Sequence, residues 1–187
     1  MKPRGDRQRG DGEEGVQVLW APWRMQYIEA GITPDCIFCS PATEEVLRHH
    51  LILCVTPHAR VMLNKYPYNS GHLLVAPRRH TALLADLSGD EYNDLMELLR
   101  RAVAVLDTAL HPQGMNIGLN LGTSAGAGIA DHLHWHVVPR WQGDTNFMPV
   151  IGAVKVIPQH LMESYDQLRP LFTASCGERQ TGGPDQK

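Results

Sequence analysis

One stretch near the middle of the chain limits the possible folds more than any other. It reads His-Leu-His-Trp-His-Val-Val-Pro over residues 132–139. Alternate side chains of a β-strand point to opposite faces of its sheet. A strand here places its three histidines on one face and Leu133, Trp135 and Val137 on the other, where they can enter a core. The pattern therefore predicts a sheet with one apolar face and one face that carries chemistry.

Several shorter runs predict the strands that would pair with this one. Residues 51–55 and 60–63 are rich in β-forming side chains, and Thr56-Pro57-His58 separates them, which indicates a hairpin. Residues 71–76 and 115–121 are further short runs of the same kind. We expect these segments to form a sheet together with the histidine-bearing strand.

The clearest helix starts at Ser88. Glu91 follows three residues later, as in a capping box, where the two residues hydrogen-bond to each other's backbone. Apolar residues then recur at helical spacing until His111-Pro112, because proline cannot continue a helix. This stripe consists of Leu95, Leu99, Ala102, Leu106 and Leu110. Since strands and helices do not alternate as βαβ units, we predict an α+β fold: a mostly antiparallel sheet of about five strands, one long helix and a shorter one.

Length and composition fit one globular domain. The chain has 187 residues, of which 43% are hydrophobic and 20% charged, enough for a single core. The first and last segments are polar and hold almost nothing to bury. We therefore expect one domain over residues 16–174 between disordered tails at 1–15 and 175–187.

Charge and hydropathy exclude several classes of partner. The net charge is −3 and the isoelectric point is about 6.3, so no basic field favours nucleic acid. No apolar run approaches the roughly 20 residues of a membrane span, and residues 1–15 lack the apolar segment of a secretory signal. The four cysteines are too few for a disulfide scaffold. We expect a cytoplasmic protein without a nucleic-acid or membrane partner.

A loop of small residues leads into the histidine stretch. Residues 120–128 read Asn-Leu-Gly-Thr-Ser-Ala-Gly-Ala-Gly. Glycines let backbone N–H groups turn toward an anion, and Asn120, Thr123 and Ser124 add side-chain donors. A flexible connection between two strands is the alternative, but the position directly before the histidines favours a phosphate-binding loop.

Cys36 and Cys39 form a Cys-x-x-Cys pair, a spacing found in metal sites and in redox sites. A thioredoxin-like redox role requires a βαβ context, which this sequence does not offer. Two buried thiols without a metal remain the other interpretation.

Taken together, these segments resemble the histidine triad superfamily over residues 17–158. The H-x-H-x-H motif followed by apolar residues is the signature of that superfamily. The other matching segments are Cys-Ile-Phe-Cys at 36–39, as in zinc-containing bacterial members, and Asn64, Gly-His-Leu-Leu-Val at 71–75, Pro77 and His80. Stretches such as LWAPWRMQYI and GLNLGTSAG are most similar to the branch of diadenosine tetraphosphate phosphorylases, and next to the fragile histidine triad hydrolases.

The resemblance implies an enzyme that cleaves a dinucleoside polyphosphate at its α-phosphate. His134, the middle histidine, would be the nucleophile and carry a covalent nucleotidyl group, since a neutral imidazole is a good nucleophile near pH 7. His136 and His72 would line the active site, and Asn120 would stabilise the transferring phosphoryl group. The matching nucleotide-binding positions are Asn64 for the ribose, Ile37, Phe38 and Met62 for a purine base, and Ser124 and Gly126 for phosphate.

The resemblance also implies a structural zinc ion and a homodimer. Structural zinc takes four Cys or His ligands in a tetrahedron. The four matching positions are Cys36, Cys39, His80 and His132. With His132 used as a ligand, His134 would remain available for chemistry.

One departure from the superfamily concerns the loop before the triad. Many members have a Gly-Gln pair there, whereas residues 126–128 are Gly-Ala-Gly. The phosphate contact of that glutamine is either absent or replaced, with Ser124 as the nearest candidate, so the leaving-group preference stays open. The similarity to the phosphorylase branch implies water or phosphate as the acceptor. Two other functions stay open: hydrolysis of nucleoside phosphoramidates or acyl-nucleotides, and a nucleotide-binding regulatory module with vestigial activity. The presence of His134 makes the second of these the weaker one.

Overall fold

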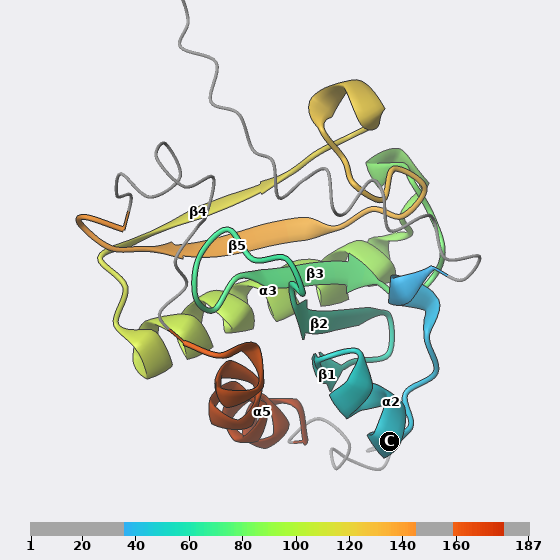
Figure 1. Ribbon diagram of the computed structural model, residues 1–187. Helices are drawn as coiled ribbons and strands as arrows, with labels where there is room; N and C mark the ends of the chain where they lie inside the picture. The colour runs from blue at the N-terminus through green and yellow to red at the C-terminus, as the bar shows by residue number, and fades with distance from the viewer. Residues whose placement is uncertain (1–35, 145–158, 178–187) are drawn as a thin grey trace, which may run out of the picture.

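The computed structural model describes residues 36–144 and 159–177, and its strands form one antiparallel sheet (Figure 1). The strands are β1 (Ile52–Val55), β2 (Ala59–Leu63), β3 (Leu73–Pro77), β4 (Gly114–Leu119) and β5 (Trp135–Arg140). They lie in the order β1-β2-β3-β5-β4, with every neighbouring pair antiparallel. The histidine-bearing strand is therefore inserted between β3 and β4. The predicted α+β class and antiparallel sheet are confirmed.

Two long helices and several short ones accompany the sheet. The α-helices are α2 (Glu44–His49), α3 (Gly89–Leu110) and α5 (Leu161–Gly177), and the 3₁₀ turns are η1 (Ile37–Cys39), η2 (Leu84–Asp86) and η3 (Thr123–Ala125). The second long helix, α5, was not located from the sequence, and Pro170 interrupts its backbone hydrogen bonding. Because α5 ends at Gly177, residues 175–177 are helical rather than part of a tail. The remainder of the expected tails lies outside the described residues.

The capping box at the start of α3 is present as predicted. The Ser88 hydroxyl accepts a hydrogen bond from the Glu91 backbone N–H, and the Ser88 N–H donates to the Glu91 carboxylate. At the other end His111 takes a left-handed conformation and stops the helix before Pro112. The buried residues of α3 are Leu95, Leu98, Ala102 and Leu106, which places most of the predicted apolar stripe against the sheet.

The sheet carries a separate apolar core on each face. On one face α3 packs across β2, β3 and β5, and α5 packs on β1 and α3 (Figure 1). On the other face a smaller core contains Phe38 of η1, Leu47 of α2, Met62 of β2 and Leu74 of β3. The predicted active face is thus partly covered by the segment that carries the two cysteines. None of the described helices is long and apolar enough to cross a membrane.

Gly71 lies in the loop before β3, next to the last turns of α3. Its φ is +73°, and a Cβ there would press into the Leu110 side chain and meet Leu106 Cδ2 at 3.3 Å. We expect Gly71→Ala to lower the free energy of unfolding by about 1–3 kcal/mol, from strain and overpacking. Urea unfolding measures this, with Gly114→Ala as the control, because a Cβ at Gly114 has no neighbour within 4 Å. Equal stability of the two variants would contradict the prediction.

Candidate functional site

The three histidines lie at the start of β5 and just before it. The strand begins at Trp135, three residues later than expected from the sequence, so His132 and His134 precede it. The alternation nevertheless holds across this boundary. Trp135 and Val137 pack into the helix-covered core, while the rings of His134 and His136 lie 5.0 Å apart on the opposite face. The His132 ring also lies on that face, 4.9 Å from the Phe38 ring, so the first two histidines keep the alternation although neither belongs to the paired strand.

His134 is held in one orientation by its surroundings. Its Nδ1 lies 2.8 Å from the backbone carbonyl of His132, which can only accept a hydrogen bond, so Nδ1 carries the proton. The Phe38 ring stacks on it with centroids 4.9 Å apart. Burial lowers the pKa of His134, partly opposed by the carbonyl bond, which keeps the ring neutral near pH 7. Nε2 is therefore left with an unprotonated lone pair, the state that a nucleophile requires.

A chain of hydrogen bonds fixes the proton of the neighbouring His136. The backbone N–H of Tyr68 donates to His72 Nδ1 at 3.0 Å, so the His72 proton sits on Nε2. That Nε2 lies 2.9 Å from His136 Nδ1 and donates to it. A neutral His136 must then carry its own proton on Nε2, the opposite corner of the ring. His136 is thereby prepared as a hydrogen-bond donor beside the lone pair of His134.

The small-residue loop enters the same region from β4. The last pair between β4 and β5 joins Leu119 to Trp135, so Asn120, the next residue, falls opposite His134. The Asn120 amide donates to the Gly126 carbonyl at 3.5 Å, which closes the loop on itself. Gly122 and Gly126 both have positive φ, a conformation that suits glycine. Ser124 at the tip is exposed, as a phosphate-binding position requires.

The positions expected to hold the nucleoside differ in exposure. Ile37 is half-buried, whereas Phe38 and Met62 are buried in the core of this face. Asn64 is half-buried, with its carbonyl oxygen accepting from the Tyr66 N–H and its amide 3.3 Å from His72 Nδ1. Asn64 therefore touches the same histidine that orients His136. Phe38 supports the His134 ring directly, while Ile37 offers the more accessible apolar surface.

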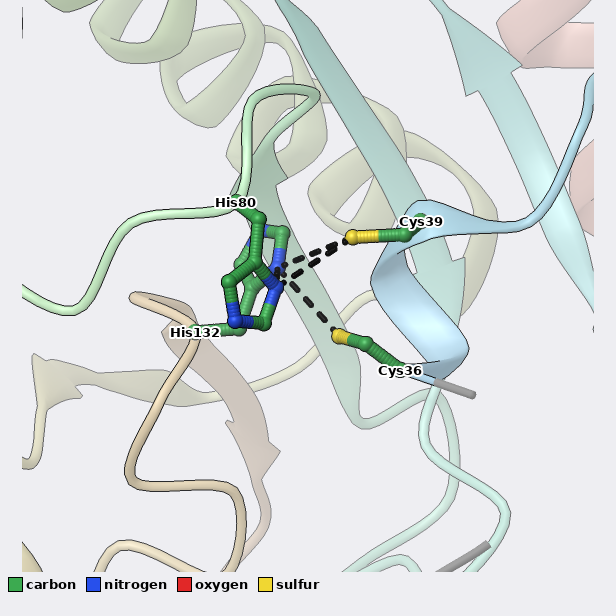
Figure 2. A group of neighbouring side chains, drawn as sticks. All are labelled: Cys36, Cys39, His80 and His132. Carbon is green, nitrogen blue, oxygen red and sulfur yellow. Dashed lines mark hydrogen bonds between the residues drawn. The ribbon is translucent and has the colours of Figure 1, made fainter. Parts of the chain in front are cut away.

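Two cysteines and two histidines converge beside the triad. Figure 2 shows Cys36 and Cys39 of the η1 turn pointing toward His80, which follows β3, and His132, which precedes β5. Their ligand atoms all lie within 4.8 Å of one another. Cys36 Sγ is 3.3 Å and Cys39 Sγ 3.6 Å from His132 Nδ1, and the two histidine Nδ1 atoms are 3.2 Å apart. All four residues named from the sequence are brought together.

The chemistry of this cluster suits a metal ion. Tetrahedral zinc with bonds of about 2.0 Å to nitrogen and 2.3 Å to sulfur spaces its ligand atoms roughly 3.3–3.8 Å apart, close to the separations found here. The His132 Nε2 donates to the Pro77 carbonyl at 2.9 Å, so its Nδ1 directs a lone pair into the cluster. Burial also lowers the pKa of His132 to about 4, which keeps the ring neutral. These residues could therefore hold a metal ion.

Comparison with known proteins places this arrangement in a family. A family model described as the HIT domain matches residues 48–143, slightly more than half of the chain. The chain belongs to the HIT domain family. This HIT protein is 43% identical to the AP-4-A phosphorylase of Mycobacterium tuberculosis (strain CDC 1551 / Oshkosh) over 165 residues, which cover 83% of this chain and 85% of that protein. It is also 33% identical to the asymmetrical bis(5'-nucleosyl)-tetraphosphatase of Schizosaccharomyces pombe over 89 residues, 48% of each chain.

Solved structures of HIT proteins share the fold. The Zn-bound histidine triad family protein of Mycobacterium smegmatis superposes with a TM-score of 0.57 at 23% identity, over 78% of this chain and 98% of that one. The NitFhit protein of Caenorhabditis elegans superposes with a TM-score of 0.53 at 29% identity, over 64% of this chain and 27% of that one. The antiparallel sheet described above is thus the HIT fold.

Some contacts in the HIT site of this chain cannot be predicted from the sequence. The Tyr68 ring lies 4.8 Å from the His72 ring and stacks on His136 at 5.9 Å, in addition to the backbone bond that sets the His72 proton. Nearby, the Asn69 amide donates to the Pro139 carbonyl and to Asp144, which ties the loop before β3 to the end of β5. A backbone donor has no residue type, so only the fold reveals the first of these contacts.

Proposed function

We propose that this HIT protein cleaves dinucleoside polyphosphates, such as diadenosine tetraphosphate, at the α-phosphate through a covalent nucleotidyl-His134. One observation carries the proposal. A buried, neutral imidazole has its Nδ1 proton fixed on a carbonyl and its Nε2 lone pair unprotonated, beside a second histidine whose proton is fixed by His72. The two enzyme relatives support the substrate class, because their names describe the phosphorolysis and the hydrolysis of such nucleotides.

In the first step, His134 Nε2 attacks the α-phosphorus. A phosphorus–nitrogen bond forms while the bond from phosphorus to the leaving phosphate chain breaks. His136 Nε2–H donates a hydrogen bond to the departing oxygen, which leaves as an anion. His136 stays neutral, and the His72 bond to its Nδ1 keeps the proton on Nε2. Asn120 and the backbone of the 122–126 loop would stabilise the charge on the phosphoryl oxygens.

In the second step, an acceptor replaces the imidazole. Water or inorganic phosphate attacks the same phosphorus, the phosphorus–nitrogen bond breaks, and His134 Nε2 regains its lone pair. When the acceptor is water, its proton passes to the product or to solvent, and His136 keeps its Nε2–H throughout, so the starting state is restored. Because this loop lacks the glutamine of many relatives, the exposed Ser124 hydroxyl is the side chain that we expect to contact the phosphates. Gly126 would contribute a backbone contact.

The nucleoside would lie over the neighbouring part of the same face. We expect Ile37 to contact a purine base, with the buried Phe38 and Met62 forming the apolar floor beneath it. Asn64 would hold the ribose hydroxyls from the end of β2. Since the Asn64 amide also touches His72, binding of the ribose and orientation of the catalytic histidines would share one residue.

A structural zinc ion is part of the proposal. Cys36, Cys39, His80 and His132 would hold it as two thiolates and two neutral imidazoles. Four protein ligands leave no open position, so the ion would supply rigidity rather than chemistry. It would fix the η1 turn, and with it the Phe38 ring that packs on His134.

A homodimer in the cytoplasm is also proposed. The dimer is supported by the place of β4 at the edge of the described sheet, where Ile117 keeps 47% of its surface exposed. An exposed edge strand with apolar side chains favours pairing with a second chain. Light scattering on the purified protein tests the dimer, and the cytoplasmic location stays a prediction from the sequence.

Product analysis with and without inorganic phosphate tests the function. Incubated with diadenosine tetraphosphate, a phosphorylase yields ADP plus ATP only when phosphate is present. A hydrolase yields AMP plus ATP without it. We expect one of these two product pairs, since both acceptors reach the same nucleotidyl-histidine.

Failure to form either pair would overturn the assignment of the substrate. Turnover of a nucleoside phosphoramidate or an acyl-nucleotide would then place the same histidine chemistry on a different leaving group. Binding of nucleotide without turnover of any of these compounds would favour a regulatory module.

A further inference from the structure

A pocket lies beside the cysteine turn. It has a volume of about 460 Å³ and is lined by the segment after η1, the turn between β1 and β2, the loop after β3 and Glu91 of α3. None of the triad histidines lines it, nor do Asn64 and Asn120. The pocket is therefore separate from the site proposed for nucleotidyl transfer.

The floor of this pocket contains a buried cation. Arg60 of β2 keeps only 4% of its surface exposed. One guanidinium nitrogen donates to the Ser40 carbonyl at 2.9 Å, but Nε has no hydrogen-bond partner among the described residues. No carboxylate in that part of the chain forms an ion pair with it. Burial of a charged group without a counter-ion is costly, so its retention calls for a binding partner.

The neighbouring charges add to that of Arg60. Arg78 is exposed, and its guanidinium donates to the Pro57 carbonyl at 3.1 Å, which holds it over the hairpin turn at the pocket. Arg79 is paired with Glu91 through two bonds of 2.7 and 2.9 Å, so that carboxylate is already engaged. Burial, and then the charge of Arg78, lowers the pKa of Arg60, while Cys39 and Cys36 of the metal-ligand cluster raise it by a smaller amount. The pocket is left with positive charge in excess.

The adjacent metal cluster does not remove this excess. Cys39 lines the pocket and belongs to the cluster. A divalent ion bound by two thiolates and two neutral imidazoles would have no net charge, so it would leave the Arg60 guanidinium unbalanced. An anion in the pocket would then supply the counter-charge that no carboxylate of the described residues provides.

We propose that this pocket binds a phosphate group, with Arg60 and Arg78 as its main ligands. Guanidinium groups present paired N–H donors whose geometry matches phosphate oxygens, and their bonds to such anions are strong. The volume accommodates more than one phosphate. The group can belong to free phosphate, to a polyphosphate chain or to a nucleotide. The proposal does not depend on the chemistry of His134.

The Arg60 Nε–H offers a direct probe of binding. In the full-length, ¹⁵N-labelled protein its buried signal reports on this pocket and not on the triad. We expect a saturable shift of the signal with inorganic phosphate, tripolyphosphate or AMP, and none with chloride at matched ionic strength. The compound that binds most tightly identifies the source of the phosphate group.

Arg78→Gln should weaken this binding about tenfold, the effect of losing one charge-assisted contact. Arg100→Gln is the matched control, since Arg100 is also exposed but pairs with Glu97 on α3 and does not line the pocket. A shift confined to the signals of His134 and His136 would place the anion at the triad and overturn the proposal. So would an equal shift with chloride, no saturable shift at all, or equal affinity of wild type and Arg78→Gln.

Discussion

His134→Ala is expected to lower the rate of dinucleoside polyphosphate cleavage by about 10⁴-fold or more, the usual cost of deleting a nucleophile. The reason is that the other buried imidazole beside His136, that of His72, has its unprotonated nitrogen engaged by the Tyr68 N–H. The fold should survive, because the ring is held by one carbonyl bond and by stacking on Phe38 rather than by a network. Steady-state kinetics and circular dichroism measure the two effects.

The control for this variant is His49→Ala, since His49 is an exposed histidine at the end of α2 and outside the site. Intact-protein mass spectrometry adds a chemical readout. Wild type quenched during turnover should gain the mass of one nucleotidyl group, and His134→Ala should not. Retained turnover in His134→Ala, or a nucleotidyl group mapped to another residue, would exclude His134 as the nucleophile.

Loss of the metal is expected to lower the thermal midpoint by roughly 10 °C. A ligand present at about a thousand times its dissociation constant contributes about 4 kcal/mol, and each kcal/mol is worth about 2–4 °C in a chain of this size. We expect purified protein to contain about one zinc ion per chain, and chelation or His80→Ala to remove it. Elemental analysis and thermal unfolding follow the two quantities.

His80 is the ligand chosen for replacement because its side chain is exposed. In a protein without metal, replacing an exposed histidine changes stability little. His58→Ala is the matched control, an exposed histidine on the neighbouring hairpin turn that is not a ligand. If His80→Ala and His58→Ala have the same thermal midpoint and neither contains less zinc than wild type, the proposed metal site is wrong.

The parts of the site that depend on side-chain type could be predicted from the sequence. Alternation of histidine with apolar residues identified the two faces of β5, and the ligand set Cys36, Cys39, His80 and His132 emerged as one cluster. The capping box at Ser88 fixed the start of α3. The two faces of β5 and the start of α3 follow from short local patterns, whereas the ligand set was implied by the resemblance to the histidine triad superfamily.

Other parts depend on how distant segments meet. The backbone N–H of Tyr68 sets the proton position of His72 and thereby that of His136, yet any residue type can donate it. Burial of Phe38 against His134 follows from docking of η1 on the sheet. The strand order that inserts β5 between β3 and β4 is likewise a property of the whole sheet. These features required the three-dimensional structure.

The separation of the metal ligands along the chain bears on refolding. Cys36 and His132 are 96 positions apart, so an ion that joins them closes a loop that spans most of the sheet. Such distant ligands come together only when the sheet has assembled, so the binding free energy of the ion is also folding free energy. The chain entropy of closing that loop is then met by the packing of the sheet before the ion binds. Binding would therefore come late in refolding, and the ion would slow unfolding more than it speeds folding.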